Sequence, residues 1–141
     1  MGIRSKLPLV LVLLVFVIGS WGIFSLTKPN EDDDSARELV SIIVPDLKHE
    51  DQKGKALFDA NCCMCHGNNG VGNSDAGPPL IHKIYEPGHH ADFAFFRAVE
   101  LGVRAHHWQF GDMPPVANLK QEDVASIINY VRVVQRANGI Q

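Results

Sequence analysis

The sequence predicts an all-α fold, and three observations lead to this class. Apolar residues near the C-terminus recur at intervals of three and four, the pattern of one buried helix face: Val124, Ile127, Ile128, Val131 and Val134. The stretch 92–101 has the boundaries of a helix, with Asp92 at its start and Gly102 after its end. No stretch alternates convincingly between polar and apolar residues, as a half-buried strand does.

We expect three helices, over residues 50–61, 92–101 and 121–137. Gly54 lies inside the first helix, where glycine costs about 1 kcal/mol relative to alanine. The expected compensation is the close approach of another helix. Asp92 is the expected N-cap of the second helix.

An uncharged run of 20 residues from Leu7 to Leu26 precedes these helices. As a helix it spans about 30 Å, the hydrocarbon thickness of a bilayer. Arg4 and Lys6 precede the run and an acidic run follows it, so the positive-inside rule places the N-terminus in the cytoplasm. We expect residues 1–26 to be a single-pass anchor; the alternative is a cleaved signal peptide. Either way the rest of the chain is exported.

Residues 27–47 have the composition of a linker, and residues 48–141 form one domain. The acidic residues of the linker favour a solvated tether. The apolar stretch 39–44 is expected to pack on the domain or at the membrane surface. The formal net charge of −3 gives no indication of nucleic-acid binding.

Residues 62–66 carry the pattern C-x-x-C-H, in Cys62, Cys65 and His66, which is the signature of covalent haem attachment. Two thiols at this spacing can form thioethers with the two vinyl groups of one haem, and the histidine that follows is a standard iron ligand. A thioredoxin-like C-x-x-C would need a βαβ context. A zinc site would need further ligands, and only Cys63 and scattered histidines remain. We therefore predict one covalent haem c.

Met113 is the expected second axial ligand of the iron. Met1 lies across the predicted membrane and Met64 lies within the attachment turn, whereas Met113 is followed by Pro114 and Pro115 on a stiff loop. Ligation by histidine and methionine closes both axial positions and raises the reduction potential relative to two histidines. Together with the absence of a recognisable acid–base or nucleophile constellation, this predicts an electron carrier rather than an enzyme.

The chain resembles the class I cytochrome c family over residues 48–141. The resemblance rests on four features: Gly54 and Phe58 ahead of C-x-x-C-H, the loop 77–80 (Gly-Pro-Pro-Leu), Met113 with its two prolines, and a last helix with Tyr130. It implies a small cytochrome c fold of about three to five helices around a covalent haem, here preceded by one transmembrane helix. It further implies that the first and last helices cross at Gly54.

The same resemblance implies residue roles. Phe58 would meet Tyr130, and the carbonyl of Pro78 would accept a hydrogen bond from His66, which would orient the imidazole. From the residues alone, the Gly-Pro-Pro segment is either such a support or a plain loop turn.

Members of the family carry single electrons between respiratory or photosynthetic complexes. The expected partners are membrane complexes, a quinol-oxidising donor and a terminal oxidase. The expected location is the inner membrane, with the haem domain on the periplasmic side. Two alternatives remain: a cytochrome subunit of a larger dehydrogenase or reductase, and a haem or copper sensor.

Two histidine doublets, 89–90 and 106–107, are unusual in so short a domain. They can contact haem propionates, bind copper with His82 or Cys63, or be ordinary loop residues. Trp108 either shields the haem edge or packs in the core. These alternatives stay open from the sequence.

Overall fold

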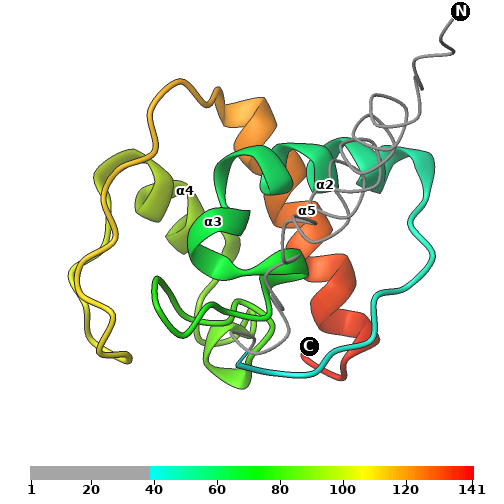
Figure 1. The fold of residues 1–141 in the computed structure, drawn as a ribbon. Helices are drawn as coiled ribbons and strands as arrows, with labels where there is room; N and C mark the ends of the chain where they lie inside the picture. The colour runs from blue at the N-terminus through cyan, green and yellow to red at the C-terminus, as the bar shows by residue number, and fades with distance from the viewer. Residues whose placement is uncertain (1–38) are drawn as a thin grey trace, which may run out of the picture. The chain divides into compact units, whose positions relative to one another are not determined.

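The computed structural model describes residues 39–141, which form a helical domain (Figure 1). The elements follow one another in the order α2 (His49–Asn61), α3 (Cys63–His66), η2 (Asn68–Gly70), η3 (Lys83–Tyr85), α4 (Asp92–Leu101) and α5 (Gln121–Ala137). Within these residues there is no strand, and the pairing between extended segments is limited to two isolated bridges. The predicted all-α class is confirmed for this part of the chain.

The three predicted helices are present, and α2 begins one residue earlier than expected, at His49. The predicted membrane anchor, residues 1–26, lies outside the described residues. None of the helices described from residue 39 onward is long and apolar enough to cross a membrane.

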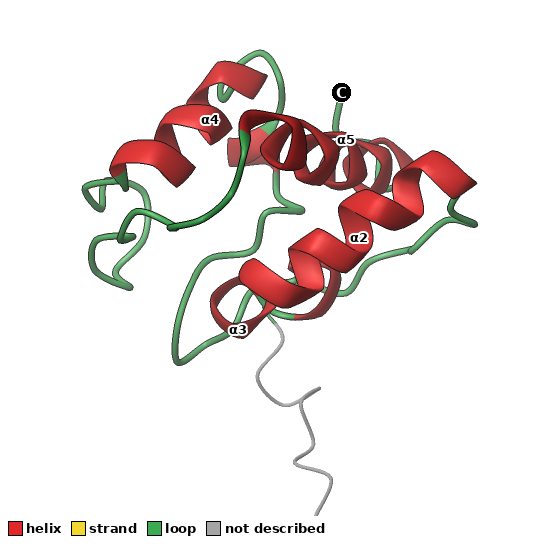
Figure 2. Ribbon diagram, turned by 90° about the horizontal axis from the view of Figure 1, so that it is seen from above, coloured by secondary structure: helices red, strands yellow, loops and turns green. Residues whose placement is uncertain are grey.

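Helices α2 and α5 pack against each other (Figure 2). Gly54 of α2 lies at a close approach to α5. A Cβ atom on Gly54 would lie 2.1 Å from the carbonyl oxygen of Ser126 and 2.8 Å from the Cβ of Tyr130. The expected crossing at Gly54 is therefore confirmed, because a larger residue would push the two helix backbones apart.

The core is built on this helix pair. Phe58 of α2 and Tyr130 of α5 are completely buried, with their ring centroids 5.6 Å apart and their planes inclined by 58°. Such a tilted pair is a favourable arrangement of two aromatic quadrupoles. The hydroxyl of Tyr130 donates a hydrogen bond to Oδ1 of Asn69 at 2.8 Å, so burying the ring leaves no unsatisfied polar group there.

Arg132 of α5 is buried and connects that helix to the segment before α4. Its guanidinium donates to the carbonyl oxygens of Tyr85 (2.6 Å) and His90 (2.5 Å) and to Oδ1 of Asp92 (2.9 Å). The prediction that Asp92 caps α4 was wrong: Ala91 holds the N-cap position without a side-chain hydrogen bond. The Asp92 carboxylate instead balances the charge of a buried cation, which needs a partner more than the helix end does.

The apolar stretch after residue 38 contacts the helical domain. The backbone N–H of Ile43 donates to Oδ1 of Asn138 at 2.7 Å, and the amide group of Asn138 donates back to the carbonyl oxygen of Ile43 at 2.7 Å. The N–H of Leu39 bonds the carbonyl of Val71. Ile42 is partly buried against the core, while the side chain of Ile43 is 67% exposed.

Replacing Gly54 by alanine should strongly destabilise the domain. The new methyl group would collide with the backbone of α5, and we expect the free energy of unfolding to fall by about 2–3 kcal/mol. Guanidinium unfolding followed by circular dichroism measures this change. Gly88→Ala is the matched control, because a Cβ there meets nothing within 4 Å; equal effects of the two substitutions would contradict the close crossing.

Candidate functional site

A cavity of about 470 Å³ opens beside the cysteine-rich turn, within the range of cofactor pockets. Its walls are mainly apolar. The residues that the sequence analysis singled out as ligands all line it: Cys62, Cys65, His66 and Met113, with Pro78 beside them. Segments on both sides of α4 thus meet at one cavity.

The attachment turn, residues 62–66, is a single turn of helix. Its geometry determines which of its residues line the cavity. The backbone N–H groups of Cys65 and His66 both bond the carbonyl oxygen of Cys62, at 3.1 and 2.9 Å. This turn brings Cys62, Cys65 and His66 to the cavity wall. The other two residues do not line the cavity: Met64 is 84% exposed, and the Sγ of Cys63 lies 3.0 Å from Oδ1 of Asn68.

His66 is oriented by a backbone carbonyl. Its Nδ1 lies 2.8 Å from the carbonyl oxygen of Pro78, which can only accept, so Nδ1 carries the proton and Nε2 carries the lone pair. Burial lowers the pKa of His66, and the hydrogen bond to Pro78 opposes this only in part. The imidazole is therefore neutral at pH 7, the form that binds a metal. The contact with Pro78 that the resemblance implied is present.

The loop that carries Pro78 lies tightly against the attachment turn. A Cβ on Gly77 would lie 2.7 Å from the carbonyl oxygen of Cys65. The N–H of Gly72 bonds the carbonyl oxygen of His66 at 2.7 Å. These contacts fix the distance between the Pro78 carbonyl and the His66 imidazole. The orientation of His66 is therefore set by backbone contacts.

Met113 is held at the base of the loop 103–113. It forms an antiparallel bridge with Val103, with reciprocal N–H···O bonds of 2.9 Å. Inside the loop, Oδ1 of Asp112 accepts from the N–H of Ala105 at 2.8 Å. Gly102 precedes the loop with φ of +75° and ψ of −179°, a conformation that glycine alone adopts readily. The thioether is thus presented from a fixed backbone.

The thiols do not have the properties of a redox pair. Burial, followed by the neighbouring Cys63 and Cys65, raises the pKa of Cys62 to about 11. Catalytic C-x-x-C cysteines have lowered pKa values, and the described residues contain no strand that would give a βαβ context. The zinc alternative at the cysteines is also not supported: in residues 39–141 the grouping of three possible metal ligands consists of His89, His90 and His107 and includes no cysteine.

Trp108 provides an independent test of whether a polar-edged cofactor fits the cavity. Its indole ring lines the cavity, and its Nε1 is buried and makes no hydrogen bond of good geometry with any described residue. A poorly aligned hydrogen bond from it to the nearby Tyr85 hydroxyl lowers the Tyr85 pKa against the larger rise from burial. A buried N–H left unpaired costs about 1–3 kcal/mol. A carboxylate of haem would supply the missing acceptor, so the residues present fit this group.

An apolar cavity beside two thiols and an oriented, neutral imidazole defines a c-type haem site in a small helical protein. A family model agrees: that of cytochrome c matches residues 52–135. The chain therefore belongs to the cytochrome c family. This family binds haem c covalently, usually one per domain of this size, and the C-x-x-C-H stretch fits such a site. No curated protein matches the sequence.

Sequence reasoning missed part of the cavity wall. Tyr85, Phe95 and Val99 line the cavity, although none belongs to a motif. Phe95 lies on α4 near Arg132, whose guanidinium carbon is 4.8 Å from the ring centroid. No periodic signal distinguishes such residues from ordinary core residues, so only the three-dimensional structure identifies them.

Replacing Gly102 by alanine should displace the Met113 loop. A Cβ there would lie 2.4 Å from the carbonyl oxygen of Met113, in a backbone conformation that alanine avoids. We expect a loss of about 3 kcal/mol in the free energy of unfolding, since overpacking adds to backbone strain.

The control is Gly111→Ala in the same loop, where φ is +85° but no atom lies within 4 Å of the new Cβ. It should lose only about 1 kcal/mol through strain. Denaturant titration of both variants measures the difference, and a larger loss in Gly111→Ala would refute the close contact of Gly102 with Met113.

Proposed function

We propose that this cytochrome c is a membrane-tethered carrier of single electrons with one haem. The observation that carries the proposal is that the oriented His66 and the fixed Met113 line one apolar cavity together with the two thiols. In this proposal Cys62 and Cys65 hold the haem covalently, and His66 and Met113 are the axial ligands of its iron. When bound, the haem supplies an iron that gains and loses one electron.

The described residues are suited to that task. The apolar lining excludes water from the cavity, and the Pro78 carbonyl keeps the proton of His66 on Nδ1, which would leave the lone pair on Nε2 for the iron. Rigid presentation of both ligands limits the change in geometry between oxidation states. Closed axial positions disfavour reactions with small molecules.

The membrane tether and the partners rest on the sequence. The uncharged run 7–26 with basic residues before it favours an inner-membrane anchor and a periplasmic haem domain. Such a tether raises the effective concentration of the haem at membrane complexes. The proposed donor is a quinol-oxidising complex and the proposed acceptor a terminal oxidase. Reduction of the purified protein by the first and reoxidation by the second, in single turnovers, tests the assignment; failure of both transfers would refute it.

Met113→Ala should abolish iron–methionine ligation. We expect the weak long-wavelength absorption band of the oxidised protein to disappear, because it requires the iron–sulfur bond, and the reduction potential to fall, because the thioether ligand that raises it is lost. Carbon monoxide should then bind the reduced form. Met64→Ala is the control, since Met64 is exposed and does not line the cavity; loss of the band in that variant instead would overturn the ligand assignment.

Cys65→Ala should leave haem attached through one thioether only, and the α-band of the reduced protein should shift to longer wavelength, because one vinyl group stays conjugated with the ring. Cys63→Ala should change neither attachment nor spectrum, since Cys63 does not line the cavity. Haem staining of denaturing gels and pyridine haemochrome spectra measure both. Identical behaviour of the two variants would show that the attachment residues were assigned incorrectly.

A further inference from the structure

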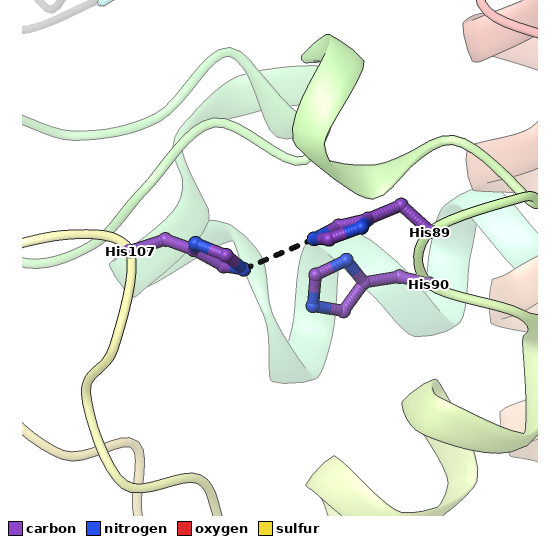
Figure 3. A group of neighbouring side chains, drawn as sticks. All are labelled: His89, His90 and His107. Carbon is purple, nitrogen blue, oxygen red and sulfur yellow. Dashed lines mark hydrogen bonds between the residues drawn. The ribbon is translucent and has the colours of Figure 1, made fainter.

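Three histidines from two segments converge outside the proposed axial ligands (Figure 3). His89 and His90 lie between η3 and α4, and His107 faces them from the loop 103–113. We propose that these three imidazoles bind one divalent transition-metal ion of the zinc type. None of the three is a proposed ligand of the haem iron, although His90 and His107 also line the haem cavity, and the site goes beyond the proposed function.

The spacing of the nitrogen atoms fits a metal ion. Nε2 of His89 and Nε2 of His107 are 3.3 Å apart. Zinc–nitrogen bonds of about 2.0–2.1 Å at tetrahedral angles place two ligand nitrogens about 3.3 Å from each other. One ligand atom from each of the three residues lies within 4.8 Å of the others.

The backbone around the doublet supports this arrangement. Nδ1 of His90 donates to the carbonyl oxygen of Ile84 at 2.7 Å, which leaves the lone pair of His90 on Nε2. Metal-binding histidines commonly donate their other ring N–H to a carbonyl in this way. The N–H groups of His89 and His90 both bond the carbonyl oxygen of Glu86, at 3.0 and 2.8 Å. The carbonyl of His90 is held in turn by buried Arg132.

His89 and His107 are both exposed, so an ion can enter the cluster from solvent. In the absence of metal, the same 3.3 Å separation is compatible with an N–H···N hydrogen bond, so direct binding must decide.

A bound ion would connect two segments that meet at the cavity. The doublet belongs to the segment held by Arg132, and His107 belongs to the loop that ends at Met113. Metal binding to the folded form alone stabilises that form. The ion would therefore hold the loop 103–113 against the segment that carries His89 and His90.

Calorimetric titration of Zn²⁺ into the full-length, haem-loaded protein tests the proposal. We expect saturation at one ion per chain, and a gain in thermal stability that a chelator reverses. His107→Gln and His89→Gln should each weaken binding on the order of tenfold or more, by losing a ligand. His49→Gln, which changes an exposed histidine at the start of α2, should leave the affinity unchanged.

Absence of saturable binding would overturn the proposal, as would equal weakening by His49→Gln. An unchanged haem absorption spectrum shows that a variant is folded. Zinc X-ray absorption provides a second measurement, with at least three nitrogen neighbours at about 2.0 Å expected; a shell of oxygens only would also refute the site. None of these measurements depends on electron transfer, so this proposal and the proposed function can fail separately.

Discussion

The contact between α2 and α5 at Gly54 is the constraint on which the rest of the domain depends. Because the helix backbones approach so closely there, Phe58 and Tyr130 meet in the core. The attachment turn comes directly after α2 in the chain. Arg132, which is buried, belongs to α5, the other helix of the pair. The position of the thiols and of the cavity wall is therefore set by one place where only a hydrogen atom fits.

Around this frame, the ligands are positioned by backbone rather than by side-chain packing. Pro78 offers a carbonyl to His66, and Gly77 allows its loop to lie against Cys65. Met113 is fixed by its bridge with Val103. Backbone contacts of this kind hold a side chain within a narrow range of orientations, which suits a centre that must change little when it gains an electron.

The sequence predicted those features that have a periodic or spaced signature. The apolar positions of α5 and the C-x-x-C-H spacing are of this kind. Gly54 is another, because a glycine inside a helix is explained by the close approach of a second helix. Asp92 was misread because capping is a local rule, whereas the carboxylate responds to a buried guanidinium 40 positions later in the chain. The cavity role of Tyr85 and the meeting of the histidine doublets depend on tertiary contacts between loops, which no local pattern records.

The contacts of Arg132 have a consequence for the order in which the protein matures. The carbonyls of Tyr85 and His90 accept hydrogen bonds from Arg132 on the last helix. Their segment therefore lacks these bonds until the C-terminal helix has been synthesised. The thiols, by contrast, emerge much earlier. During synthesis there is consequently an interval in which the attachment turn exists without the complete cavity wall. The cysteines are accessible in that interval, and the folding of α5 against this segment ends it.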